Sequence, residues 1–337
     1  MNVKSDSGSA KNEDAKAVLF QEIDGTTYDV GLPLDSKVDI KEIMTELGLP
    51  SYIDLEYYPM RNAIVTLWAS QKANGLHRLY PQAYEKEISN KPISTLLFGG
   101  GAVKIHCQHS NGKGALSRAI KDMDTIIPKS QGSNFIKLLL NMDKAFGTQF
   151  KFFKTKADAL FNAMRQGQRY RVKAVNGITE QGLPTVTVLD IFCDCIDLRH
   201  KVEVKDSFDH CKENLFTIGL EYLLLSKCQL IMDLPKTDLS LVQQQGQAFR
   251  ILPYDYYPQD RIILGMEEKD ARDVCAIFLD HPIGDGLEQI NVGKIRKALE
   301  KDKKLALTVT LNLQNLVGRP ELMEKWMSKS EASSVVE

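Results

Sequence analysis

Apolar residues recur every three or four positions in many stretches of this chain, and segments rich in Gly, Pro, Asn and Ser separate these stretches. That spacing predicts amphipathic helices with one face on a core. The predicted helices cover residues 38–47, 60–72, 133–146, 157–164, 218–232, 267–279, 290–299 and 305–316. Runs of β-branched and aromatic residues between turn signals predict strands at 17–23, 26–30, 170–175 and 184–192.

The order of these elements and the polar breaks between them divide the chain into five regions. These are a disordered tail (1–15), a small N-terminal α+β module of unknown role (16–91), an α/β core (92–205), a helical C-terminal domain (206–327) with an inserted loop at about 235–265, and a second disordered tail (328–337). The tails are polar and have little to bury. Lys91-Pro92 marks the start of the core, because the residue before a proline favours extended backbone.

A glycine run follows the apolar segment Thr95-Leu-Leu-Phe98 and leads into a second apolar segment that ends at His106. Glycines at 99–101 have no side chains to keep a ligand away from the backbone amides. Residues 102–106 predict the first turns of a helix, whose free N–H groups and positive dipole end favour an anion. The segment therefore indicates a phosphate cradle, although glycine runs are also common in plain turns.

Two aspartates, Asp122 and Asp124, follow the glycine run. In a strand, residues two apart project from the same face, so both carboxylates point one way while Met123 enters the core. Parallel carboxylates repel each other unless a cation lies between them, and oxygen-rich sites of this kind suit Mg²⁺ bound to substrate phosphates. The alternative is a solvated pair of aspartates at the end of a strand.

In this order, the glycine run and the aspartate pair resemble the core motif of the polymerase-β-like nucleotidyltransferase superfamily, in its abortive-infection (AbiEii-like) toxin branch. The pattern Gly-Gly-x-Ala, then a His, then Arg118-x-x-x-Asp122-x-Asp124 carries this resemblance. Later segments are similar to the remaining motifs of that branch: Leu189-Asp190-Ile-Phe192, Tyr222-Leu-Leu-Leu-Ser-Lys227-Cys-Gln229 and Glu268-Lys-Asp270-Ala-Arg-Asp273-Val. The resemblance covers residues 96–316. It departs from the family at Ile120, where Ser or Thr is usual, and in extra residues between Leu234 and Met266.

The resemblance implies an α/β (α+β) nucleotidyltransferase core with a mixed sheet over 92–205, and a helical C-terminal domain that binds a nucleoside triphosphate such as ATP against it. It implies a Mg²⁺-dependent transfer of a nucleotidyl group to a hydroxyl acceptor, in which the metal neutralises charge on the transferred group. The roles it implies are metal binding by Asp122, Asp124 and Asp190, nucleotide binding by Gly99, Gly100, Gly101, Arg118 and Lys227, and positioning or deprotonation of the acceptor by Asp270.

The acceptor and the biological role stay open at this stage. An RNA 3′ end, a protein hydroxyl or a small molecule could each accept the nucleotidyl group, and toxin behaviour would require an antitoxin-type protein partner. A function from a different class is a catalytically inactive nucleotide-binding or sensing module. The presence of all three aspartates argues against that alternative.

Composition limits the partners. The chain has 337 residues, of which 43% are hydrophobic and 26% charged, as in globular proteins large enough for two or three domains. No apolar run approaches the roughly 18 residues of a membrane span, and the polar N-terminus is unlike a signal peptide, so we expect a cytoplasmic protein without a membrane partner. The net charge of −1 argues against broad electrostatic capture of nucleic acid.

Two local patterns allow further interpretations. The stretch 150–156 interleaves three phenylalanines with three lysines, which suits a nucleic-acid surface or, as we favour, a strand with phenylalanines inward and lysines solvated. Cys193-Asp-Cys195, with three more His and Cys residues by position 211, could hold zinc. The spacing instead favours cysteines that line a strand and the loop after it.

Lys227 lies within the apolar helix predicted at 218–232, where burying a lysine is costly unless it faces an anion. Either the side chain snorkels to solvent, or it contacts the triphosphate across the domain cleft. Both interpretations predict that Lys227→Met leaves the free protein no less stable. Only the second predicts nucleotide binding weakened by about 10- to 100-fold.

Overall fold

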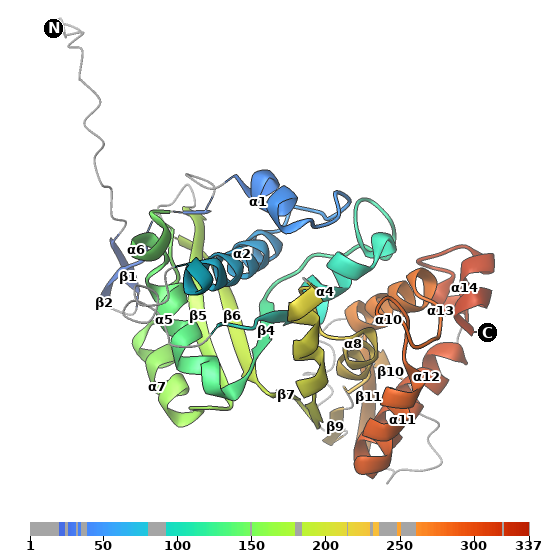
Figure 1. Cartoon of the computed structure of the whole chain (residues 1–337). Helices are drawn as coiled ribbons and strands as arrows, with labels where there is room; N and C mark the ends of the chain where they lie inside the picture. Colours follow the sequence, from blue (N-terminus) through green and yellow to red (C-terminus); the bar gives the residue numbers. More distant parts are fainter. Residues whose placement is uncertain are drawn as a thin grey trace, which may run out of the picture.

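The structure is a computed structural model that describes most of the chain. Figure 1 shows a sheet flanked by helices in one half of the molecule and a group of C-terminal helices in the other. The described residues are 20–23, 26–31, 33–34, 39–79, 92–148, 150–178, 184–213, 215–229, 232–235, 248–250, 261–318 and 320–336. The tail predicted at 1–15 lies outside them.

A mixed four-stranded sheet forms the centre of the first half, in the order β3-β4-β6-β5. Its strands are β3 (Leu96–Phe98), β4 (Met123–Ile127), β6 (Pro184–Cys193) and β5 (Arg169–Ile178). β4 runs antiparallel to β3 and parallel to β6, and β6 runs antiparallel to β5. The mixed α/β architecture expected from the sequence is therefore confirmed.

Helices from both sides of the predicted domain boundary cover this sheet. Helix α2 (Tyr58–Leu79) packs on β4 and β6, and both α5 (Gly132–Leu140) and α7 (Lys156–Met164) pack on β5. Most of the described buried apolar side chains, from position 34 to position 335, belong to one continuous cluster. The first part of the chain thus contributes directly to the core around the sheet.

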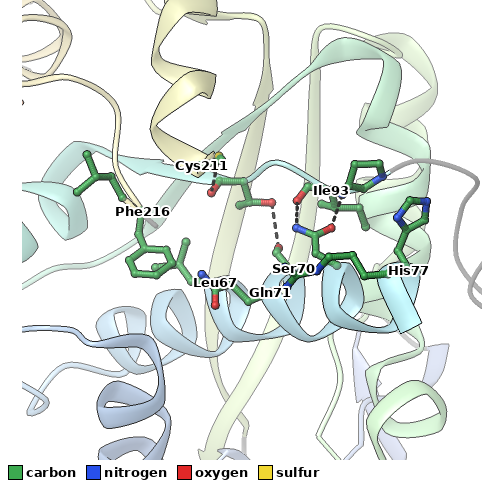
Figure 2. Close-up of a pocket in the computed structure, with 12 residues that line it drawn as sticks. Leu67, Ser70, Gln71, His77, Ile93, Cys211 and Phe216 are labelled. Carbon is green, nitrogen blue, oxygen red and sulfur yellow. Dashed lines mark hydrogen bonds between the residues drawn. The ribbon is translucent and has the colours of Figure 1, made fainter. Parts of the chain in front are cut away.

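Polar side chains of α2 tie this helix to the segment that enters β3 (Figure 2). The Asn74 side chain pairs with the backbone of Ile93 through two hydrogen bonds of 2.7 and 2.8 Å. The Ser70 hydroxyl donates to Thr95 Oγ1 at 3.0 Å. These three hydrogen bonds, of which the Ser70–Thr95 bond is fully buried, hold α2 against the segment before β3. Residues 80–91, between the two segments, lie outside the described chain.

The inserted loop predicted at about 235–265 contains strands in its described parts. β9 (Met232–Pro235), β10 (Ala248–Arg250) and β11 (Arg261–Glu267) form a small antiparallel sheet in the order β10-β11-β9. Residues 236–247 and 251–260 are outside the described chain. The helix predicted at 218–232 is also shorter than expected. Its observed counterpart, α8, covers only Leu220–Lys227, and strand β9 starts at Met232.

The prediction of a disordered tail at 328–337 was wrong. Helix α14 (Lys329–Val336) buries Ala332 and Val335 and packs against the C-terminal helices. Ser328 and Glu331 exchange hydrogen bonds between side chain and backbone at its start, which is a capping box. Ala332 and Val335 are three positions apart, so they lie on one face of this short helix, and that face is buried.

The remaining elements complete the architecture. The strands predicted at 17–23 and 26–30 are present as the antiparallel pair β1 and β2, and residues 24 and 25 between them lie outside the described chain. The other elements are β1 (Phe20–Ile23), β2 (Thr26–Asp29), α1 (Ile40–Leu47), α4 (Gly99–His106), η2 (Gln108–Ser110), η3 (Lys129–Gln131), α6 (Met142–Phe146), β7 (Cys195–Asp197), β8 (Lys201–Glu203), η4 (Lys205–Glu213), α10 (Glu268–Asp280), α11 (Val292–Lys301), α12 (Lys303–Val317) and α13 (Pro320–Met323). Within the described chain, none of the helices has both the length and the apolar character needed to cross a bilayer.

Candidate active site

Two predicted site residues face each other across neighbouring strands. Asp124 on β4 is the register partner of Asp190 on β6. Because parallel partners in register project from the same face, the two carboxylates share one side of the sheet. Met123 is 4% exposed and enters the core, as predicted, while Asp122 precedes β4 and is exposed to solvent.

The glycine run begins helix α4 directly beside Asp124. Gly99 has a φ of +69°, and a Cβ there would lie 2.7 Å from Asp124 Oδ2. A Cβ at Gly100 would lie 2.5 Å from Arg118 Nη2. The first turn of α4, with its free backbone N–H groups, is therefore held against a carboxylate and a guanidinium. Gly101 has a different neighbour, since its nearest atom is the Met60 sulfur at 3.9 Å.

Asp124 is a carboxyl group without a partner. It makes no hydrogen bond or ion pair with any other described residue. The pKa of Asp124 is raised to about 7, first by burial and then by the negative charges of Asp122 and Asp190, while Lys227 and Arg169 act in the opposite direction. Such a group is stabilised by a proton or by a cation.

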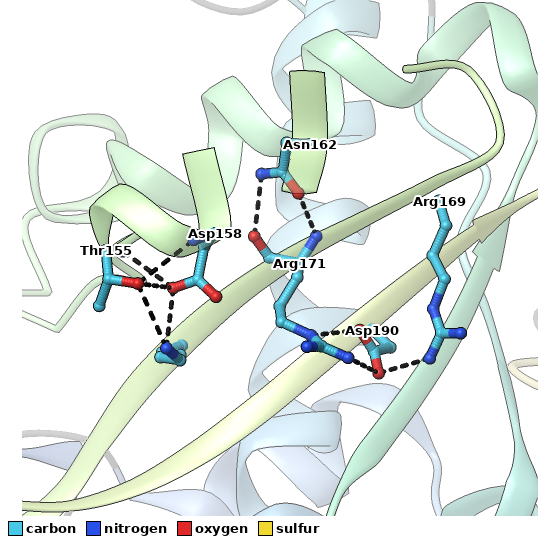
Figure 3. A network of polar contacts seen from close by, with 7 residues as sticks. Thr155, Asp158, Asn162, Arg169, Arg171 and Asp190 are labelled. Carbon is cyan, nitrogen blue, oxygen red and sulfur yellow. Dashed lines mark hydrogen bonds and ion pairs between the residues drawn. The ribbon is translucent and has the colours of Figure 1, made fainter. Parts of the chain in front are cut away.

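Asp190, by contrast, is fully paired (Figure 3). Arg171 donates from Nε to Oδ1 at 2.8 Å and from Nη2 to Oδ2 at 3.0 Å, and Arg169 donates to Oδ2 at 2.7 Å. The two arginines are two apart on β5, so both lie on the face that carries Asp190. Their guanidinium groups also stack on Phe192 and Phe161, at 4.2 and 4.8 Å from the ring centroids.

A second charged cluster joins the C-terminal helices to the glycine run. Lys227 Nζ lies 3.0 Å from Asp270 Oδ1 and 2.8 Å from Asp273 Oδ2. Arg118 makes a two-pronged contact with Asp273, from Nε at 2.9 Å and from Nη2 at 2.5 Å. The second oxygen of Asp270, Oδ2, is buried without a hydrogen-bond partner.

These contacts decide the protonation of the cluster. Burial by itself would lower the pKa of Lys227, but Asp273 and Asp270 outweigh burial and the pKa is raised. Burial would raise the pKa of Asp273, and Lys227 and Arg118 lower it below its usual value. The lysine and its partner are thus both charged at neutral pH. Lys227 is 7% exposed, so the snorkelling interpretation was wrong.

The structure gathers most of the predicted site residues around the start of α4. Those brought together are Gly99, Gly100, Arg118, Asp124, Asp190, Lys227 and Asp270. Asp122, Asp124 and Asp190 do not place three carboxylate oxygens within 4.8 Å of one another, because Asp190 turns both oxygens to the arginines. Arg169, Arg171 and Asp273 had no predicted role at the aspartate site. The alternating Arg169-Tyr-Arg171 pattern and the spacing of Asp273 from Asp270 were their signals.

The structure also shows the surroundings of the Phe/Lys stretch at 150–156 and of the cysteine pair Cys193 and Cys195. The phenylalanines of 150–156 are all buried, as favoured, so they are not available to stack bases. Lys151 is not solvated as expected, since it is buried and pairs with Asp29 at 2.5 Å. Cys193 ends β6 and Cys195 begins β7, and no third ligand joins them among the described residues.

Comparisons of this chain with models of protein families, with curated proteins and with solved structures found no match.

Proposed function

We propose that this protein is a Mg²⁺-dependent nucleotidyltransferase that moves a nucleotidyl group from a nucleoside triphosphate to a hydroxyl acceptor. One observation carries the proposal: the first turn of a glycine-initiated helix lies against an unpartnered carboxyl group, with a second carboxylate in register on the next strand. Helix N-termini bind phosphates, and carboxylates bind the divalent ion that accompanies them. The sequence motifs are consistent with this arrangement.

The residues fit a magnesium ion. Mg²⁺ prefers oxygen ligands and is usually held by one or two carboxylates plus substrate phosphates. Asp124 has a raised pKa and no protein partner, and Asp122 precedes it by two residues with an exposed carboxylate. When bound, the ion would supply charge neutralisation at the transferred phosphate.

The chain's own residues have separate tasks in this proposal. The N–H groups of the first turn of α4 bind phosphate oxygens, and Arg118 adds positive charge beside Gly100. Lys227 and Asp273 fix the orientation of Arg118 through a shared ion pair. Asp270 uses its unpartnered Oδ2 to accept a hydrogen bond from the acceptor hydroxyl.

The transfer is a displacement at the α-phosphate. The acceptor oxygen forms a bond to that phosphorus, the bond from phosphorus to the bridging oxygen breaks, and pyrophosphate leaves with the electron pair of the broken bond. The proton of the hydroxyl passes to Asp270 or to water. The site therefore needs to hold phosphates and to position a hydroxyl, and these are the tasks assigned above.

Asp190 has a supporting task in this scheme. Its oxygens are used by Arg169 and Arg171, so we assign the metal to Asp122 and Asp124. The paired Asp190 adds negative charge beside Asp124 and so favours a cation there.

Both carboxylate oxygens of Asp190 are paired with arginines. This pairing favours a second function, a catalytically inactive nucleotide-binding module. A transferase that needs three free carboxylates would be impaired by the two arginines. The two functions differ in outcome, because a binding module would bind nucleotide and Mg²⁺ without releasing pyrophosphate.

The test uses the full chain incubated with each labelled nucleoside triphosphate, Mg²⁺ and either bulk RNA, a protein extract or no acceptor. We expect label transfer by wild type and its loss in Asp122→Asn and Asp124→Asn, because one charge fewer weakens metal binding without removing apolar packing. Asp197→Asn on β7, which changes a carboxylate outside the site, is the matched control and should keep activity. Equal turnover in wild type and both site variants would contradict the metal assignment.

A further inference from the structure

Histidines gather around one carboxylate at the far end of helix α4. His106 is the last residue of α4, and His281 directly follows the last residue of α10. The chain has 6 histidines, and three of them, these two and His210, lower the pKa of Glu288 against the effect of its burial. The cluster is outside the aspartate site, at the opposite end of a helix about 12 Å long.

Three of these residues bring metal-ligand atoms together. One atom each from His106, His281 and Glu288 lie within 4.8 Å of one another, and no other His, Cys, Asp or Glu group in the described chain does so with three members. Glu288 Oε2 is 3.0 Å from His106 Nδ1, and the rings of His106 and His281 lie edge to face with their centroids 5.7 Å apart. Donor atoms on a tetrahedral zinc ion lie roughly 3.3 Å apart, so small side-chain rotations would complete the geometry.

The surroundings hold each ligand in place. The other ring nitrogen of His106 contacts Thr217 Oγ1, and His281 Nδ1 lies 3.1 Å from the backbone oxygen of Glu288. Second contacts of this kind are the usual support of metal-binding histidines. Because a carbonyl oxygen can only accept, Nδ1 of His281 carries the proton. The lone pair is then on Nε2, which is buried and has no hydrogen-bond partner, so Nε2 is the ligand atom.

The backbone around the cluster favours a cation. The C-terminal ends of α4 and α10 both point their partial negative charge toward it. The loop that carries Glu288 is closed by hydrogen bonds from Ile290 to Pro282 and from Gly284 to Ile290. Both histidine side chains are 7% exposed and that of Glu288 is 56% exposed, so an ion could enter from the glutamate side.

We propose that His106, His281 and Glu288 form a binding site for a divalent transition-metal ion, with zinc as the best match. Two imidazoles and one carboxylate suit zinc and its neighbours and do not suit Mg²⁺, which prefers oxygen ligands. The ion would join the end of α4 to the end of α10. It would thereby fix the glycine run relative to Asp270 and Asp273, which lie on α10. The site is independent of the proposed transfer reaction.

The test is metal binding by the full chain after chelator treatment and dialysis. We expect one equivalent of Zn²⁺ per chain by elemental analysis, a rise in the melting temperature on adding Zn²⁺, and a visible absorption band when Co²⁺ is used as the probe. Excess Mg²⁺ should not displace either ion.

Variants locate the site. Glu288→Gln changes an exposed side chain with little risk to folding and should weaken Zn²⁺ affinity by at least about 10-fold, and His281→Ala should abolish the cobalt band. His109→Gln is the matched control, because His109 pairs with Asp280 at the end of the same helix and is not a ligand. Asp122→Asn should also bind zinc normally. The proposal is overturned if wild type binds no stoichiometric zinc, if Glu288→Gln keeps full affinity, or if Asp122→Asn loses it.

Discussion

At the scale of single residues, the ionisation of Asp124 makes the free energy of unfolding depend on pH. Its pKa in the folded protein is about 7, above the unfolded value near 3.8. The folded state therefore binds a proton more tightly than the unfolded state between these values. Stability contributed by the protonated form is lost as the pH rises from about 4 to about 7.

We predict that Asp124→Asn removes this loss. A shift of this size corresponds to roughly 4 kcal/mol at ~1.36 kcal/mol per pKa unit, and partial exposure of the carboxyl reduces the expected effect to about 2 kcal/mol. The unfolding free energy of the variant minus that of wild type should grow by this amount from pH 4 to pH 8, measured by urea unfolding. A constant difference across that range would show that Asp124 ionises normally.

Lys227 gives a second prediction, and it reverses an expectation from the sequence. Lys227→Met leaves Asp270 and Asp273 buried with Arg118 as their remaining cation, so it should destabilise the free protein by about 3 to 5 kcal/mol. Lys72→Met, which removes one partner of the exposed pair with Glu46, should cost less than about 1 kcal/mol. Urea unfolding of both variants provides the comparison, and equal small effects would contradict the ion-pair account.

The sequence could show that Lys227 needed an anion but not which one. Spacing along a helix identifies the side chains that share a face, and it does not reveal which residues of another helix face them. Asp270 and Asp273 come from α10, more than forty positions later. The same limit applies to Arg169 and Arg171, whose pairing with Asp190 depends on the register between β5 and β6.

At the scale of elements, the start of α4 depends on glycine at one position and tolerates alanine at another. Gly99→Ala places a side chain at φ +69° and 2.7 Å from Asp124 Oδ2, so we expect a loss of roughly 1 to 3 kcal/mol and a large loss of label transfer. Gly101→Ala meets only the Met60 sulfur at 3.9 Å and should be neutral or stabilising by up to about 1 kcal/mol. Unfolding and transfer assays on the pair would contradict this account if both variants behaved alike.

Helices with a regular apolar spacing were predicted well from the sequence. The helix predicted at 38–47 is α1, and Gly48 ends it in the left-handed conformation that glycine adopts most easily. Helix α14 was missed, although Ser328 and Glu331 have the spacing of a capping box. The strands β10 and β11 were missed because neither shows apolar and polar residues in alternation, and the proline-containing stretch 251–260 between them was interpreted as a loop.

At the scale of the whole molecule, the chain was expected to contain separate regions, yet most of its described buried apolar side chains form one cluster from position 34 to position 335. We predict that both ends lose structure together on unfolding. Trp68 on α2 and Trp326 after α13 report on these ends in the single-tryptophan variants Trp326→Phe and Trp68→Phe. Their fluorescence midpoints in urea should coincide once the stability of each variant is accounted for by circular dichroism. Separate midpoints within one variant would indicate independent domains.

Sequence composition could not predict this shared core. The division at Lys91-Pro92 rested on a local break, and the segment 80–91 that precedes it is outside the described chain. Helix α2 nevertheless packs on the same sheet as the later helices. Pairing such as Asn74 with Ile93 becomes visible only in three dimensions.

The proposed reaction transfers the α-phosphate portion of a nucleotide to an acceptor. The most direct measurement compares two preparations of the same triphosphate, one labelled at the α-phosphate and one at the γ-phosphate, incubated with the full chain, Mg²⁺ and acceptor mixtures. We expect the α-label to become attached to the acceptor and the γ-label to appear in pyrophosphate, and we expect neither result with Asp124→Asn. Transfer of the γ-label to the acceptor, or bound nucleotide with no pyrophosphate release, would contradict it.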